Sequence, residues 1–309
     1  MSAIATSREG HAFELRPIVC PTCGDRAAQR VLGMRGGPYQ RYEQGIATRI
    51  VQCRSCSLIF PNPFPYPVAV AELYGDPSKY FANQYETTKL VSQRRLVGDL
   101  VKRSGVRMPS LIDVGSGRGE LVRAAREEGL TDVVGLEVSP AMIESARGMN
   151  GVTIILQTIE EYSASAERTF DIVVLNAVLE HVQDPSSMVQ GVAELTRRGS
   201  LVYIDVPNEP NLLTIVGNGL NRIRGSDGVI NLAPTWSPFH VFGFNERALG
   251  TLLTKHGFAV EDVVIWAAPT VPSSGKLRDR VRSMVATQIN RIANTMRMAS
   301  NMYVWARRV

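Results

Sequence analysis

Two carboxylates close two short apolar segments, and three glycines lie between them. Asp113 lies near the end of the segment 110–114, and the glycines follow at alternate positions within 115–119. Glu137 closes a second apolar segment, 133–137. Glycine tolerates positive φ and lets a ligand approach the backbone, and a following helix offers unpaired N–H groups. A carboxylate at such a turn repels a diphosphate and suits a ligand with an ammonium group or hydroxyls. Glu137 is placed to accept both hydroxyls of a ribose.

The spacing of the glycines separates this turn from two other nucleotide-binding turns. A dinucleotide fingerprint reads G-x-G-x-x-G, whereas Gly115, Gly117 and Gly119 give G-x-G-x-G. A P-loop needs G-x-x-x-x-G-K-[ST], and no Lys-Ser or Lys-Thr follows here. The order of Asp113, glycine turn, helix and Glu137 resembles the class I S-adenosylmethionine-dependent methyltransferases. A glycine-rich structural turn in another α/β protein is the alternative.

This resemblance implies an α/β domain with a Rossmann-like, mostly parallel seven-stranded sheet that has one antiparallel strand. It also implies a site for S-adenosyl-L-methionine (SAM). There the glycine turn holds the amino-acid part, Glu137 holds the ribose and Ile159 forms a wall for the adenine. The expected cofactor-binding residues are Asp113, Gly115, Ser116, Gly117, Gly119, Glu137, Val138, Ile159, Asn176 and Ala177.

A second group of candidate residues follows the buried segment 171–175. The run 179–185, Leu-Glu-His-Val-Gln-Asp-Pro, resembles a signature of small-molecule methyltransferases, including ubiquinone O-methyltransferases and sugar methyltransferases. An imidazole just past a strand's carboxyl end can accept the proton of an attacking hydroxyl or amine. His181 is therefore the first candidate for a catalytic base; its alternative role is to cap a helix or hydrogen-bond a carbonyl. His240, in the Pro-x-His-x-x-x-Phe-Asn segment 238–245, is the second candidate.

Four cysteines, all before residue 57, form two C-x-x-C pairs. They are Cys20 with Cys23 and Cys53 with Cys56. Two such pairs separated by a medium loop are the ligand set of a tetrahedral zinc site. Two disulfides are disfavoured in a reducing cytoplasm, and no thioredoxin-like βαβ pattern surrounds either pair. Four thiolates leave no open position, so the expected Zn²⁺ is structural and not catalytic.

The resemblance also covers the chain before the glycine turn. The order of C-x-x-C, apolar triplet, Asn-Pro and proline-rich turn resembles a bacterial group of methyltransferases often met among sugar- and surface-glycan-modifying enzymes. We expect a zinc-binding β module with a proline-rich connection over 1–66 and a helical connector and cofactor lid over 67–107. The methyltransferase domain is expected over 108–272. Its long segment 208–239 is predicted to be the acceptor-binding lid, in which Trp236 either stacks on a ring or anchors the segment.

The last segment, 273–309, carries eight of the 34 basic residues and one acid. Apolar residues recur at near-helical spacing over 277–308, with most arginines off that stripe. This pattern predicts a basic amphipathic C-terminal helix that packs on its own domain or on a partner. A helix lying on an anionic membrane surface is the alternative.

Composition bounds the class of protein. A chain of 309 residues with 44% hydrophobic residues suits one α/β domain with additions. The net charge of +5 comes mainly from the last segment, which leaves the rest mildly acidic. We expect neither a membrane-spanning helix nor a signal peptide, and hence a cytoplasmic location, with peripheral membrane contact as an addition.

The sequence therefore predicts SAM-dependent methyl transfer to a small-molecule or glycan acceptor. The resemblance favours a sugar hydroxyl of a nucleotide- or lipid-linked saccharide. One alternative is an RNA or protein methyltransferase that grips the macromolecule with the zinc module. Nucleic acid is disfavoured as a partner, because module and body lack a clear basic cluster. The other alternative, a SAM-binding scaffold without turnover, is distinguished by whether any acceptor takes up the methyl group.

Overall fold

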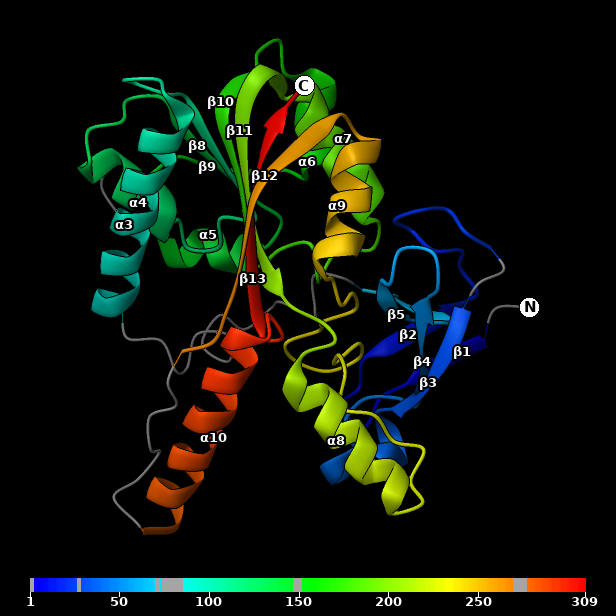
Figure 1. The fold of residues 1–309 in the computed structure, drawn as a ribbon. Helices are drawn as coiled ribbons and strands as arrows, with labels where there is room; N and C mark the ends of the chain where they lie inside the picture. Colours follow the sequence, from blue (N-terminus) through cyan, green and yellow to red (C-terminus); the bar gives the residue numbers. More distant parts are fainter. Residues whose placement is uncertain (1–2, 27–28, 70–72, 74–85, 147–151, 269–276) are drawn as a thin grey trace.

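The computed structural model describes residues 3–26, 29–69, 73, 86–146, 152–268 and 277–309 (Figure 1). A seven-stranded sheet forms the centre of this part of the protein, in the order β12-β13-β11-β10-β7-β8-β9. All neighbouring pairs are parallel except those that β13 makes with β11 and β12. The expected Rossmann-like sheet with one antiparallel strand is confirmed. The strands are β7 (Leu111–Val114), β8 (Val133–Glu137), β9 (Ile154–Leu156), β10 (Phe170–Asn176), β11 (Thr196–Pro207), β12 (Phe258–Trp266) and β13 (Asn301–Arg308).

Helices cover both faces of this sheet, because successive residues of each strand point to opposite sides. On one face, Ile112 and Val114 of β7 belong to a buried cluster with residues of three helices, α6, α7 and α9. On the other face, Leu111 packs with residues of α3 and α4. The helices are α3 (Glu86–Ser104), α4 (Glu120–Glu127), α5 (Pro140–Ala146), α6 (Ile159–Ser165), α7 (Pro185–Glu194), α8 (Leu212–Ile223), α9 (Glu246–Lys255) and α10 (Leu277–Thr295).

The strand order reverses between β7 and β10. From β7 the chain proceeds outward through β8 to β9, whereas β10 and β11 lie on the other side of β7. In open α/β sheets, ligands bind at the carboxyl ends of the strands beside such a reversal. Asp113 and Asn176 lie close to this point, near the ends of β7 and β10.

Two small three-stranded sheets, β1-β2-β6 and β3-β4-β5, precede the central sheet in the chain. Their strands are β1 (Ala3–Thr6), β2 (Ala12–Arg16), β3 (Gln29–Arg35), β4 (Thr48–Cys53), β5 (Ile59–Pro61) and β6 (Phe64–Pro67). Between the cysteine pairs, β3 and β4 pair antiparallel and form a β ribbon. Leu58, Phe60 and Phe64 belong to the buried cluster that covers one face of the central sheet. These N-terminal sheets, here called the N-terminal module, therefore pack directly on the α/β core.

The helix predicted over 277–308 is wrong in its second half. α10 ends at Thr295, and the run 301–308 is β13, which pairs with β11 on one side and β12 on the other. Met302, Val304 and Ala306 are fully buried in the core cluster, as alternating residues of a strand inside a sheet should be. Their pairing partners lie far away in the chain, so the local pattern did not reveal them.

Two further expectations are only partly covered by the described residues. The connector expected over 67–107 contains α3, while its residues 70–72 and 74–85 lie outside the described ranges. In the described part of the chain, no helix has the length and apolarity that crossing a bilayer requires.

Candidate active site

A pocket of about 940 Å³ opens at the carboxyl edge of the sheet, around the ends of β7, β8 and β10. This volume lies in the upper part of the roughly 300–1,000 Å³ range of ligand pockets. It leaves space for a second small molecule beside a cofactor. Nine of the ten expected cofactor-binding residues line it: Asp113, Gly115, Ser116, Gly117, Glu137, Val138, Ile159, Asn176 and Ala177.

Two positions in the turn after β7 require glycine. Gly115 has a φ of 71° and Gly119 one of 78°, in the left-handed region. A Cβ on Gly115 would lie 2.7 Å from Cγ2 of Val178, and one on Gly119 would lie 2.7 Å from Cγ1 of Val152. Gly119 does not line the pocket; it is the N-cap of α4, so its role is to start that helix.

Glu137 ties this turn to the end of β8. Its Oε2 accepts a hydrogen bond of 2.8 Å from the backbone N–H of Gly117. Its Oε1 accepts bonds of 2.8 and 2.9 Å from the N–H groups of Val138 and Ser139. A carboxylate oxygen has two lone pairs, so Oε2 keeps one for a ligand in the pocket. The carboxylate is thus oriented before any ligand arrives.

Asp113 lies beneath the glycine turn and is almost fully buried. Burial raises the pKa of Asp113 to about 8; the nearby carboxylates of Glu120 and Glu137 add to the rise, and Lys89 opposes it. A ligand ammonium beside this carboxyl would favour its ionised form. Asp113 therefore suits a cationic ligand group, as its position in the sequence predicts.

α3 brings two polar residues to the pocket that the sequence analysis missed. Nζ of Lys89 lies 3.2 Å from Oε1 of Glu120, and both residues line the pocket. Gln93 is 8% exposed, and its buried Oε1 has no hydrogen-bond partner among the described residues. The sequence signal that could have revealed Lys89 and Gln93 is their helical spacing with the core residues Val97 and Leu100. This spacing places both side chains on the inward face of α3.

Residues that directly follow β9 and β10 also line the pocket. Ile159, 1% exposed, begins α6 behind a capping box made by Thr158. Ala177 follows β10 with a φ of 57°, and its N–H donates to the carbonyl oxygen of Asp205 at 2.9 Å. Left-handed backbone is unusual for a residue other than glycine and is often found at functional sites. Ile159 and Ala177 thus lie where the sequence analysis expected the cofactor.

His181 and His240 lie side by side, with ring centroids 4.8 Å apart. Oε1 of the buried Glu180 lies 3.5 Å from Nε2 of His181 and 4.0 Å from Nε2 of His240. Nδ1 of His181 lies 3.3 Å from the carbonyl oxygen of Phe239, to which it donates if that nitrogen carries the proton. The side chain of His240 is the more exposed of the two, 28% against 13%. The sequence analysis predicted both imidazoles separately, and the structure brings them together.

Burial controls the protonation of this group. It lowers the pKa of His181 to about 3, with a further contribution from His240, and lowers the pKa of His240 to about 4. Burial also raises the pKa of Glu180 to about 8. Both imidazoles are therefore neutral near neutral pH and able to accept a proton. The three residues also have donor atoms within 4.8 Å of one another, a spacing at which they could hold a metal ion.

Backbone hydrogen bonds join the segments that carry the two histidines. The carbonyl oxygen of Glu180 accepts from the N–H groups of Val241 and Phe242 at 2.8 and 3.2 Å. Within the same motif, Asp184 caps α7 by accepting from the N–H groups of Ser186 and Ser187. The run 179–185 thus both fixes His181 and holds the neighbouring segment that carries His240.

A family model described as a methyltransferase domain matches residues 86–263, more than half of the chain. The chain belongs to this methyltransferase-domain family. The match begins with α3 and ends inside β12, so it includes the glycine turn, both histidines and the part of the pocket that the central sheet forms.

Individual relatives agree with this family. A ubiquinone biosynthesis O-methyltransferase of Vibrio parahaemolyticus is 32% identical over 162 residues, 51% of this chain and 66% of that protein. A SAM dependent methyltransferase from Archaeoglobus fulgidus has a TM-score of 0.50 at 18% identity, covering 75% of this chain and 97% of the other. The plantazolicin methyltransferase BpumL, in complex with a triazolic desmethylPZN analog and SAH, has a TM-score of 0.50 at 16% identity, covering 77% and 93%. The two structural likenesses concern the fold, and the chain spans just under two thirds of the Vibrio protein.

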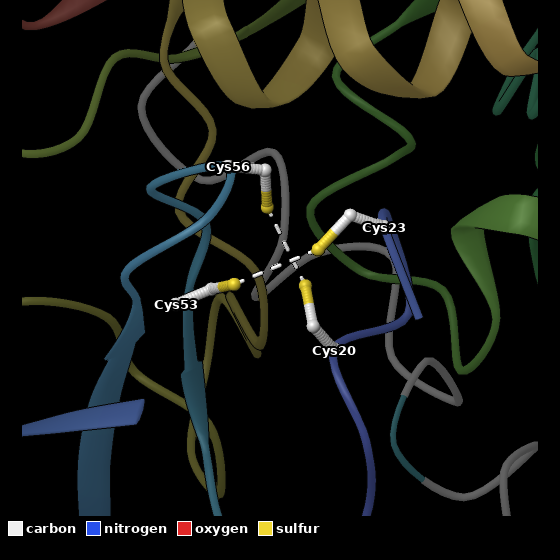
Figure 2. Close-up of side chains that lie close together, drawn as sticks. All are labelled: Cys20, Cys23, Cys53 and Cys56. Atoms are coloured by element: carbon white, nitrogen blue, oxygen red, sulfur yellow. Dashed lines mark hydrogen bonds between the residues drawn. The ribbon is translucent and has the colours of Figure 1, made fainter. Parts of the chain in front are cut away.

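The methyltransferase domain is joined to a cluster of four thiols in the N-terminal module (Figure 2). Sγ of Cys20 lies 3.4 Å from Sγ of Cys56, and Sγ of Cys23 lies 3.6 Å from Sγ of Cys53. All four sulfurs lie within 4.8 Å of one another. A tetrahedron with Zn–S bonds of about 2.3 Å needs S–S edges of about 3.8 Å, whereas a disulfide needs about 2.05 Å. The cysteines are free thiols whose geometry fits a tetrahedral metal ion.

The two C-x-x-C turns have the same local conformation. Gly24 and Ser57, each directly after a pair, have φ of 75° and 71°. Their N–H groups donate to the carbonyl oxygens of Cys20 and Cys53 at 2.8 and 2.9 Å. Ser57 thus adopts the left-handed conformation without being glycine. The hydrogen bond with Cys20 lowers the pKa of Cys56 to about 5, so one thiol of that pair ionises readily.

The segment 208–239 contributes less to the pocket of the methyltransferase domain than its polar residues suggested. Its first part forms α8, capped by Asn211, and Asn218 donates to Asn231 at 2.6 Å. Only Pro234, Pro238 and Phe239 of this segment are among the described residues that line the pocket. Trp236 is buried, with the guanidinium of Arg35 over its ring, so it has the anchoring role of the two that the sequence left open.

Proposed function

We propose that this chain transfers the methyl group of SAM to a hydroxyl of a small-molecule acceptor. The observation that carries the proposal is the placement of Asp113 and Glu137 at one pocket, on either side of the glycine turn. One carboxyl suits the ammonium of an amino-acid group, and the other keeps an acceptor site for a ribose hydroxyl. The printed activity of the Vibrio relative, an O-methyltransferase of ubiquinone biosynthesis, supports a hydroxyl as the acceptor.

In this proposal each residue acts by binding or orienting. When bound, SAM supplies an electrophilic methyl group on a sulfonium centre. Glu137 holds the ribose, and Ile159 contacts the base. Asp113 and the turn hold the amino-acid part, and the N–H groups at the start of α4 point toward its carboxylate. Since the leaving thioether is neutral, the protein contributes mainly by aligning the reactants and removing one proton.

The proposed proton acceptor is an imidazole at the pocket, and His240 is favoured over His181. The ring of His181 is turned toward the carbonyl of Phe239, whereas the more exposed ring of His240 makes no hydrogen bond with a described residue. His181 and Glu180 then orient His240 and surround the imidazolium that forms. The proposal includes a saccharide hydroxyl, which is the acceptor that the sequence analysis favoured.

We also propose that Cys20, Cys23, Cys53 and Cys56 hold a structural Zn²⁺. The support is the convergence of four buried or half-buried sulfurs from two matching turns. The ion would cross-link the two turns. It would take no part in methyl transfer, because four thiolates fill its coordination sphere. In this reading 1–66 is the zinc-binding module, 67–107 is the connector and lid, and 108–272 forms the catalytic domain together with β13.

The function is tested by binding and by label transfer. Calorimetry with S-adenosylhomocysteine should give a binding isotherm with about one site per chain. Radiolabelled SAM incubated with fractionated small-molecule extract should transfer its methyl label to one fraction. Binding without any label transfer in any fraction would favour the scaffold alternative, and absence of binding would overturn the proposal.

The roles assigned to the two histidines predict that their variants differ in methyl-transfer rate. His240→Gln should lower the methyl-transfer rate by about 100-fold or more, the usual contribution of a positioned base. His181→Gln should have a smaller effect, because it orients the base. Both variants should keep the affinity of the wild type for S-adenosylhomocysteine. Single-turnover rates at saturating SAM measure the difference, and equal rates for His240→Gln and the wild type would contradict this assignment.

Finally, we propose a peripheral contact between α10 and an anionic membrane surface, now limited to residues 277–295. Val281, Met284, Val285 and Ile292 are exposed on this helix. Arg280 and Arg291 accompany them. Flotation with phosphatidylglycerol vesicles should decrease when Met284 and Val285 are changed to Ser, and unchanged flotation would contradict the contact.

A further inference from the structure

The N-terminal module forms part of the pocket wall. Strands β2 and β6 contribute Phe13, Phe64, Pro65 and Pro67, and the segment after Trp236 contributes Pro238 and Phe239. These residues lie at the same pocket as His181 and His240, whereas the expected cofactor residues come from the ends of β7, β8 and β10. The acceptor side of the pocket is therefore built from residues outside the central sheet.

This wall is packed from behind and is therefore rigid. Phe13 and Phe239 share a buried cluster with Ile46. Phe64 stacks on Phe242, with ring centroids 5.5 Å apart and an interplanar angle of 25°. A wall of aromatic and proline side chains that is already in place suits a flat apolar surface on the ligand.

The charges of the pocket disfavour an anionic acceptor. Six carboxyl side chains line it, of which burial keeps two, Asp113 and Glu180, largely protonated near neutral pH in the absence of a ligand cation: Asp113, Glu120, Glu137, Glu160, Glu180 and Asp184. Among the described lining residues the only Lys or Arg is Lys89, and its ammonium already lies 3.2 Å from Oε1 of Glu120. A phosphate inside the pocket would meet acids without a free cation among the described residues, while the positive charge of SAM is favoured.

We infer that the N-terminal module supplies the acceptor subsite, and that this subsite takes an uncharged ring with an apolar face and a free hydroxyl. This inference rests on the proposed function and specifies its acceptor. The ring packs against Phe13 and Phe64, and its hydroxyl points toward His240. If the acceptor carries a phosphate, that group stays outside the pocket.

A matched pair of probes tests the inference with the full-length protein saturated with S-adenosylhomocysteine. The probes are phenyl β-D-glucoside and its 6-phosphate, which differ by the phosphate group alone, and saturation-transfer NMR measures their affinities. The glucoside should bind at least about tenfold more tightly than the phosphate. Phe13→Leu keeps the cluster apolar but removes the aromatic face, and it should weaken glucoside binding about three- to tenfold.

Two controls separate the subsite from the fold and from the proposed function. Ile4→Leu, at an exposed position on β1 of the same sheet, should leave both affinities unchanged. Phe13→Leu should keep the wild-type affinity for S-adenosylhomocysteine. Equal or tighter binding of the phosphate, equal effects of the two variants, or no binding of either probe would overturn the subsite. If S-adenosylhomocysteine itself did not bind the wild type, the proposed function would fall first.

Discussion

Replacing Glu137 by alanine is expected to lower the affinity for S-adenosylhomocysteine by about 100-fold or more. The variant loses the acceptor of a ribose hydrogen bond, and a bond to a charged group contributes about 1.5–3 kcal/mol. It also leaves the N–H groups of Gly117, Val138 and Ser139 without their carboxylate partner. The glycine turn should therefore lose its orientation as well as a ligand contact. Titration calorimetry measures the dissociation constant.

Two further variants show whether the loss of affinity is specific to the carboxylate of Glu137. Glu137→Gln keeps one carbonyl oxygen for the N–H groups, so we expect an intermediate loss. Glu167→Ala removes an exposed carboxylate away from the pocket and should leave the affinity at the wild-type value. An affinity within threefold of the wild type for Glu137→Ala would contradict the placement of the ribose at this residue.

Loss of the metal at the four cysteines is expected to destabilise the protein strongly. Cys20, Cys53 and Cys56 belong to the same buried cluster as the face of the central sheet. Structural zinc contributes directly to folding free energy, so an open ligand set should loosen this cluster. Cys56→Ser should lower the zinc content well below one ion per chain and lower the melting temperature by about 10 °C or more. Elemental mass spectrometry and thermal unfolding measure the two effects.

The matched control is Arg54→Ala, inside the same C-x-x-C turn but at an exposed position. It should keep both the zinc content and the melting temperature of the wild type. A purified wild-type protein without zinc, with four thiols that all react with a thiol reagent, would contradict the metal site. Equal melting temperatures for Cys56→Ser and the wild type would contradict its structural role.

The glycine turn and the cysteine pairs could be predicted from sequence because their chemistry is local. Gly115 and Gly119 need backbone conformations that other residues resist, and each cysteine pair forms one short turn. Their residues could therefore be named before any long-range contact was known. The contact between His181 and His240 could not be predicted from the sequence, because it depends on backbone hydrogen bonds from residues 241 and 242 to Glu180.

The errors occurred where distant segments decide the structure. Met302 and Tyr303 continued the helical spacing of 277–296 by coincidence, and only pairing with β11 makes them part of a strand. The partners of the asparagines in the predicted lid 208–239 could not be assigned from sequence. They cap α8 and bond to one another, because asparagine satisfies backbone and side-chain groups in turns equally well.

The position of β13 affects how the chain folds during its synthesis. β12 pairs with β13, and no other described strand borders it, although residues 258–266 leave the ribosome before 301–308 do. Until then β11 also presents one unpaired edge, since its neighbour on that side is β13. Unpaired strand edges invite association with other chains. These two edges of the nascent protein are therefore open to aggregation until β13 emerges, and a chaperone that covers β11 and β12 would act at that stage.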